Sequence, residues 1–556
     1  MKSCNYIKSI VFIIPGIFSL FLTTQAQDTL KKQTIDITSS FKPEIKEAAK
    51  INFVAEPPTP DSAKPTFSYN IPVTSLSLVY QPLAVSPLAL RIDSAAAKWD
   101  ATNFVKLGFG NYLTPFAQAG LSFNNSKNAN LNILAHYTSS KGKTPKYQEY
   151  ADAGVSAYGS LINAAKQELY GKVSLDNDKY YRYGYDHDAY QLDKSDLLQR
   201  FIGFDANVGF RNTLPTAFGL KYHPDVKLSF FTDNHSGREF NAVADLPLEK
   251  YINDELSLKL GVNADYTRYS SQNTPRDVNN TIFTIPVAVR FKNDMVNIHG
   301  GFIPSWDNSA FRLLPDLMTD FKLGGEGLIV QLGWLMHYDK GSYKRFTSIN
   351  PYIAQPAQLL NTRINETYGG IKGTFLERFF YNAKVGLVQF FNMPLFVNDY
   401  GTPGVPLSGN RFSIRNEAKL NAFQMHGEVG VIQAEDFSLT GRFNWLLFNK
   451  QKTEAQAWGI TPREFNATLR WQILNGLWLK SDLFFFEGAK YINRNGSVGT
   501  GRHPVDLSAG LEFKITRQFN LWVQANNVFN NKYQRWNQYD VYGFNILGGI
   551  VYNFSK

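Results

Sequence analysis

The sequence contains a single cysteine, Cys4, which lies at the very start of the chain. Internal disulfide bonds and thiol chemistry are therefore excluded for the rest of the protein. No stretch reaches 18 consecutive apolar residues, so the sequence predicts no transmembrane helix. The eight histidines share no metal-ligand spacing. The triplet Asp186-His187-Asp188 lies in a Tyr-rich polar stretch, where a solvated loop is expected, and we predict neither a metal nor a cofactor.

Catalytic and nucleic-acid-binding signals are also missing. No G-x-S-x-G element occurs, and we expect that the protein is not an enzyme. The formal net charge is +10, but the basic residues are scattered through the chain, which argues against nucleic-acid binding. The modest excess favours anionic solutes or the phosphate groups of lipids as partners.

The N-terminus has the features of an export signal. Lys2 and Lys8 precede the apolar run Ile10–Leu22, and small residues at Thr24 and Ala26 fit a cleavage site. The alternative is a membrane anchor, but the run is shorter than the roughly 20 residues that a spanning helix needs. We therefore expect a signal peptide at 1–26.

Residues 27–100 differ in composition from the rest of the chain. They include the Pro-rich piece EPPTPDSAKP (56–65). Proline removes a backbone hydrogen-bond donor, so such a stretch cannot form the interior of a sheet. We expect an extended segment that lies in the periplasm or in a lumen.

From about residue 103 to Phe554, short stretches alternate apolar and polar residues. In 505–515, the odd positions from Val505 to Ile515 are apolar, whereas most even positions are polar or charged. Successive side chains of a strand point to opposite faces, so a period of two predicts strands. About twenty such stretches behind an export signal predict an all-β protein, with a transmembrane antiparallel β-barrel of 20–22 strands at 101–556.

The barrel prediction explains two further properties. Aromatic residues make up 15% of the chain, as expected for the aromatic girdles of such barrels. Short connections such as 291–294 and 474–476 tend to alternate with long polar ones. The long connections are 139–149, 177–197, 270–280, 393–411, 449–460 and 488–503. We therefore place the protein in the outer membrane of a Gram-negative bacterium, in contact with its lipids and lipopolysaccharide.

The polar face of the strands carries charges of both signs. Such charges would be costly in a dry core but are natural in a water-filled lumen. The charged residues predicted to face the lumen are Lys259, Asp265, Arg442, Arg470, Lys480, Asp506, Glu512 and Lys514. Their mixture of signs does not select a solute class.

The chain ends in an apolar strand, NILGGIVYNF (545–554). Its residues Ile550, Tyr552 and Phe554 share one face. This ending looks like the signal that the outer-membrane barrel-assembly machinery reads, so we expect that machinery as a partner.

Residues 519–533 (FNLWVQANNVFNNKY) resemble the penultimate strand and turn of TonB-dependent receptors. Segments 39–53, 105–121 and 136–143 look like outer-membrane proteins of the Bacteroidetes group. The resemblance implies a receptor barrel for solute uptake. It also implies a TonB box at Thr34, Ile35, Asp36, Ile37 and Thr38, whose alternative is an ordinary short β segment. Residues 27–100 are too few for the plug domain of that family, so a full plug is not expected.

Two functions from different classes remain open. The first is passage of a solute across the outer membrane, in the manner of a TonB-dependent receptor. The second is a non-conducting barrel subunit or scaffold, bound to other envelope proteins. An outer-membrane enzyme with dispersed catalytic residues is a third and weaker alternative.

Overall fold

The computed structural model describes residues 103–554, apart from residues 127, 273, 275, 377, 403, 404, 434 and 435. The predicted signal peptide, the Pro-rich segment 27–100 and the TonB-box-like segment Thr34–Thr38 lie outside the described residues. Among the described residues, no helix is long and apolar enough to cross a bilayer.

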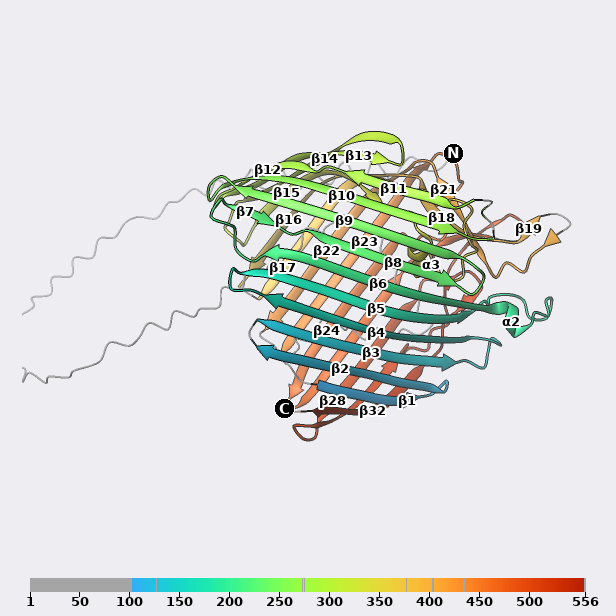
Figure 1. Ribbon diagram of the computed structural model, residues 1–556. Coiled ribbons are helices and arrows are strands. Elements are labelled where there is room, and N and C mark those ends of the chain that lie inside the picture. Colours follow the sequence, from blue (N-terminus) through green and yellow to red (C-terminus); the bar gives the residue numbers. More distant parts are fainter. Residues whose placement is uncertain are drawn as a thin grey trace, which may run out of the picture. The chain divides into compact units, whose positions relative to one another are not determined.

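Twenty-four strands join in one sheet, in which all paired neighbours are antiparallel (Figure 1). In its first half they are β1 (Asn103–Gly110), β2 (Thr114–Ser126), β3 (Ala129–Lys141), β4 (Glu149–Ile162), β5 (Gln167–Tyr181), β6 (Leu198–Asn212), β7 (Leu220–Tyr222), β8 (Asp225–Asp233), β9 (Arg238–Tyr251), β10 (Leu256–Ser270), β11 (Val278–Thr284) and β12 (Val287–Lys292). The second half contains β13 (Val296–Asp307), β14 (Ala310–Lys322), β15 (Ile329–Asp339), β16 (Thr362–Phe375), β17 (Phe379–Phe391), β22 (Leu420–Gln433), β23 (Phe437–Gln451), β24 (Arg463–Leu474), β25 (Leu477–Phe486), β28 (Val505–Lys514), β29 (Phe519–Asn526) and β32 (Asn545–Phe554).

The sheet closes on itself because the last strand, β32, pairs with β1 from Asn103↔Phe554 to Gly110↔Leu547. Two positions in the ring are each filled by a pair of short strands. Pro224 separates β7 from β8, and Pro286 separates β11 from β12, since proline cannot donate to the ladder. The ring is therefore a closed barrel of 22 strands, at the upper end of the expected range.

The alternation in the sequence becomes an alternation of exposure along the strands. On β28, Val505 and Phe513 are 39% and 49% exposed, whereas Asp506 on the other face is 2% exposed. On β10, Leu258, Leu260 and Val262 are exposed in the same way. The barrel therefore presents large apolar side chains on its outer face, which suits contact with a hydrocarbon layer.

The long connections gather at one end of the barrel. The first strand starts and the last strand stops at the same end (Figure 1). The short connections 291–294 and 474–476 lie at this end, and all six predicted long connections lie at the other. The structure adds two long connections that the pattern did not single out, 340–361 and 527–544.

The long connections contain small elements of their own. These are α2 (Lys194–Leu197), α3 (Tyr343–Ile349), β18 (Met393–Asn398), β19 (Gly401–Thr402), β20 (Val405–Pro406), β21 (Phe412–Glu417), β26 (Lys490–Ile492), β27 (Val498–Thr500), β30 (Gln534–Trp536) and β31 (Tyr539–Asp540). Their strands pair with one another, as in β18 with β21, and do not join the barrel sheet. Single bridges join Phe412 to Ile353 and Lys490 to Trp458.

Candidate functional site: a lid of long loops

Four long connections pack together at one end of the barrel, and we call them the lid: 182–197, 340–361, 392–419 and 527–544. Their shared core is aromatic. Tyr352 and Trp536 are each 1% exposed, and the rings of Tyr352 and Tyr539 stack with their centroids 3.6 Å apart. Phe201, Phe231 and Tyr269 on the barrel wall belong to the same cluster. The lid therefore has a dry core that is continuous with the wall.

The lid joins nearly opposite sides of the barrel. The loops 182–197 and 392–419 leave the ring at almost diametrically opposed positions, yet Asn410 Nδ2 donates to the carbonyl of Arg182 at 3.1 Å. A ring of this strand number is more than ~30 Å wide, given a spacing of about 4.8 Å between strands. The loop 527–544 contacts both of them, because Tyr539 Oη donates to Asn410 O at 2.5 Å and Tyr183 Oη donates to Asp540 O at 2.7 Å. The loops thus bridge the mouth of the barrel.

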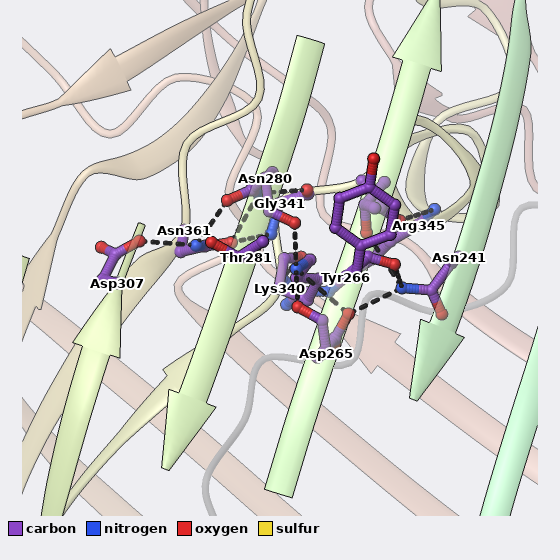
Figure 2. A network of polar contacts seen from close by, with 12 residues as sticks. Asn241, Asp265, Tyr266, Asn280, Thr281, Asp307, Lys340, Gly341, Arg345 and Asn361 are labelled. Atoms are coloured by element: carbon purple, nitrogen blue, oxygen red, sulfur yellow. Dashed lines mark hydrogen bonds and ion pairs between the residues drawn. The ribbon is translucent and has the colours of Figure 1, made fainter. Parts of the chain in front are cut away.

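A polar cluster anchors both ends of the loop 340–361 to the wall (Figure 2). Lys340 Nζ lies 3.1 Å from Asp265 Oδ1 on β10. Asn361 Nδ2 donates to Asn280 Oδ1 and to Asp307 Oδ1, both at 2.7 Å. Asn280 is completely buried. Buried polar groups that satisfy one another in this way fix a single geometry, so the loop has one defined seat on β10, β11 and β13.

The N-terminus of α3 is capped twice. Ser342 Oγ accepts a hydrogen bond from the backbone N–H of Arg345 at 3.1 Å. The carboxylate of Glu239, on β9, accepts from the backbone N–H of Tyr343 at 2.5 Å and of Lys344 at 3.3 Å. These N–H groups have no partner within the helix, and the positive end of the helix dipole favours a carboxylate there. Glu239 therefore docks α3 against the wall.

Side chains of α3 add a second set of contacts with the wall strands. Tyr343 Oη donates to Asp233 Oδ2 at 2.6 Å. The remaining partners are Lys344 with Asp205 and Ser229, and Arg345 with Asp339. Burial raises the pKa of the Tyr343 hydroxyl well above its ordinary value, and the charge of Asp233 adds to this effect. The hydroxyl therefore remains a donor to Asp233 at physiological pH.

Charged groups in the lid lose solvation. Burial lowers the pKa of Lys340, and the attraction of Asp265 opposes this shift. Burial, together with the smaller effect of the charge of Arg411, lowers the pKa of Arg182 to about 10. Arg182 donates to Gln199, a neutral partner. Arg182 is thus a buried cation that solvent would stabilise, and this lowers the cost of parting the loop 182–197 from its neighbours.

A second carboxylate ties two loops of the same end together. Glu417, at the end of β21, accepts hydrogen bonds from the backbone N–H groups of Lys419 (3.1 Å), Lys452 (2.8 Å), Thr453 (2.9 Å) and Glu454 (2.6 Å). Burial pushes its pKa upwards, but these donors outweigh burial and lower the pKa below the ordinary value. The loop 392–419 is thereby joined to the loop 452–462.

The charged residues singled out in the sequence are dispersed over the strands and do not form one cluster. Asp265 belongs to the lid anchor. The contacts of the others are Arg442 with Glu428 at 3.0 Å, Arg470 over the ring of Trp478 at 4.6 Å, Asp506 with Tyr533 Oη at 2.7 Å, and Glu512 with Lys106 at 3.8 Å. Lys259 lies opposite Glu249, whereas Lys480 and Lys514 are exposed. Within the described residues, no group of three or more His, Cys, Asp or Glu side chains could hold a metal ion.

Sequence reasoning missed most of the lid anchor, including Lys340, Asn361 and α3. The segment Gly341-Ser342 does offer a helix start, but the usual acidic residue of a capping box is missing from the first turn. Glu239 takes its place from 104 residues away in the chain. No local pattern could have shown this pairing.

No family model and no curated protein matches the chain. Solved structures do resemble it. The FrpB iron transporter from Neisseria meningitidis (F3-3 variant) has a TM-score of 0.64 at 11% identity, over 82% of this chain and 81% of that one. P. aeruginosa FpvA bound to a pyoverdine–iron complex has a TM-score of 0.60 at 12% identity, over 82% and 71%. The siderophore receptor PirA from Acinetobacter baumannii has 0.60 at 10%, over 82% and 80%. At these identities the similarity shows the barrel fold.

Proposed function

We propose that this protein is an outer-membrane barrel that passes a solute across the outer membrane of a Gram-negative bacterium, with the lid as its gate. The observation that carries the proposal is the hydrogen bond between Asn410 and Arg182. It joins two loops from nearly opposite sides of a closed ring of 22 strands, so that the loops cross its mouth. A solute that enters at this end meets the lid first. The dispersed charges from Lys259 to Lys514 would then line the passage below it.

The structural neighbours support one class of solute. These proteins are an iron transporter, a receptor bound to an iron–pyoverdine complex and a siderophore receptor. Ferric complexes of small organic chelators are therefore the first solutes to test. The same neighbours support energised uptake, in which TonB would grasp the segment Thr34–Thr38. The protein would be a receptor of the Bacteroidetes type without a full plug, and the short segment 27–100 would take the place of that plug.

Other partners belong to the same proposal. The strand that carries Ile550, Tyr552 and Phe554 would be read by the barrel-assembly machinery. Ile550 and Phe554 are exposed on the outer face, and the ring of Tyr552 contacts that of Phe554 with centroids 4.6 Å apart. Lipids and lipopolysaccharide would surround the apolar outer face.

A second candidate function is a permanently closed barrel that acts as a subunit of an envelope complex. The dry core around Tyr352 and Trp536 favours it, because parting the loops would expose a large aromatic surface. Burial of apolar area stabilises by roughly 25 cal/mol per Å². A lid of this kind opens only if a ligand or an energised partner offsets that cost.

Uptake of a ferric complex by cells that express the protein tests the first candidate. We expect uptake that depends on residues 33–38, and its persistence after their deletion would remove TonB from the proposal. Conductance of the purified protein in planar bilayers separates the two candidates. Under either candidate function the wild-type protein should not conduct, because its lid is closed. A variant with a loosened lid should conduct only if the barrel is a passage.

A further inference from the structure

Three basic residues share the outer face of the barrel at the lid end. Lys179 on β5 pairs in register with Arg200 on β6, so two positive side chains stand directly opposite each other. Arg238 follows two positions further around the ring, on β9. Each lies on the same face of its strand as exposed apolar residues such as Leu175, whereas Phe201 and Glu239, next to them in the chain, are buried. The three cations therefore point away from the lumen.

A row of phenylalanines lies below these cations. Phe204, Phe230 and Phe240 are register partners on β6, β8 and β9. Their ring centroids are 6.3 Å and 5.0 Å apart along the row, and Phe230 is 50% exposed. Arg200 and Phe204 are four residues apart, or about 13 Å along a strand. Aromatic rings of this kind mark the border between hydrocarbon and headgroups, with the cations on its polar side.

The three cations lack carboxylate partners among the described residues. Lys179 contacts the ring of Tyr181, and Arg200 donates to the side-chain oxygen of Asn177. Other cations at the same end do have counter-charges, as in Arg268 with Asp277, Lys194 with Glu149 and Arg463 with Glu487. Like charges that face each other across a strand pair are destabilising. An external anion would relieve this repulsion.

We propose that Lys179, Arg200 and Arg238, with the phenylalanine row beneath them, form a binding surface for a phosphorylated lipid of the outer leaflet. The phosphate groups would contact the three cations, and the acyl chains would lie along Phe204, Phe230 and the neighbouring apolar residues. Guanidinium groups suit phosphate because they donate two parallel hydrogen bonds. The inference rests on the proposed function only in that the barrel spans a membrane.

The test measures binding of bisphosphorylated lipid A to the purified full chain in detergent, with dephosphorylated lipid A and inorganic phosphate as comparisons. We expect the wild type to prefer the phosphorylated form at least tenfold. The triple variant K179Q/R200Q/R238Q should lose this preference. The charge-preserving variant K179R/R200K/R238K should keep it, which covers the case in which the first variant folds poorly. Heat-modifiable migration on a gel reports whether each barrel is intact.

A matched control removes three cations from the opposite end of the barrel. Lys166, Lys292 and Arg517 are exposed there, and K166Q/K292Q/R517Q makes the same change in net charge. This variant should bind lipid A like the wild type. Equal binding by both triple variants would overturn the proposal. So would equal affinity for the dephosphorylated lipid, displacement of the lipid by inorganic phosphate alone, or capture of a protein on this surface in place of lipid.

Solute uptake by the same variants keeps the two proposals apart. The variant K179Q/R200Q/R238Q leaves the lid untouched and should retain uptake of the ferric complex. If wild-type cells show no uptake while lipid binding follows the pattern above, the transport proposal fails and the lipid surface stands. If uptake persists and lipid binding does not depend on the three cations, the reverse holds.

Discussion

The ammonium of Lys340 lies 3.1 Å from the carboxylate of Asp265, where the loop 340–361 leaves β15 and meets β10. The same ammonium donates to the backbone carbonyls of Asp265 at 3.0 Å and of Asn280 at 2.8 Å. Both side chains are mostly buried. One cation thus holds the base of the loop to two wall strands. Its removal takes this donor from two carbonyls and leaves the carboxylate with Asn241 Nδ2, at 2.7 Å, but without a counter-charge.

Loss of this cation should loosen the lid. We expect K340M to destabilise the seat of the loop by about 1–3 kcal/mol, because buried acceptors that lose their donor carry the full desolvation cost. Amide hydrogen exchange in 340–361 should then rise by tenfold or more, and single-channel openings should appear in planar bilayers. K292M, an exposed lysine at the other end of the barrel, is the control. Additive effects of K340M and D265N in the double variant would show that the pair is not coupled.

The stacked rings of Tyr352 and Tyr539 give a second prediction. Y539A removes a fully buried ring, and large-to-small changes of this kind typically cost about 3–5 kcal/mol. Y539F keeps the ring and loses only the hydrogen bond to Asn410 O, at about 1 kcal/mol. Limited proteolysis of the loops 392–419 and 527–544 measures the difference. Equal cleavage of the two variants would mean that stacking does not hold the lid.

Glu417 makes the lid sensitive to acid. Its folded-state pKa lies below the ordinary value of 4.5 because backbone N–H groups bind the carboxylate. Its contribution is therefore complete above about pH 4.5 and is lost as the pH falls through the lowered folded-state pKa. Proteolysis of the loop 452–462 should increase in that acid range for the wild type. E417Q should be cleaved more than the wild type already at pH 7, and its cleavage should not increase further in the acid range. If its cleavage still increases there as in the wild type, another group causes the acid sensitivity.

The alternation of apolar and polar side chains predicted most of the fold. It predicted strands at 505–515 and 545–554, where β28 and β32 lie, and it distinguished the short connections from the long ones. Strand ends were less certain, since the connection predicted at 177–197 begins within β5, which continues to Tyr181. A strand has a period of two wherever it lies, but its end depends on the neighbour with which it pairs. The splits at Pro224 and Pro286 likewise needed the register of β9 and β10.

The lid was harder to predict because its contacts are distant in sequence. Asp265 was singled out as a charge on the polar face of a strand, but its partner Lys340 lies 75 residues later. Neither Tyr352 nor Tyr539 belongs to an alternating stretch, so the pattern gave them no role. Loops without a period become ordered through aromatic packing and polar pairing between elements, and one sequence does not show which pairs form.

The two faces of β10 offer the sharpest test of the membrane placement. Leu260 is exposed on the outer face, whereas Asn263 on the other face donates to Asp245 Oδ1 at 3.4 Å. In a membrane, L260R would place a guanidinium against hydrocarbon at a cost of ~2–4 kcal/mol. N263R should be nearly neutral, because a wet lumen solvates the charge and Asp245 attracts it. Folding yield into lipid vesicles, read by heat-modifiable migration, should fall for L260R alone. Equal yields would mean that Leu260 does not face lipid, and larger losses for N263R would reverse the assignment of the two faces.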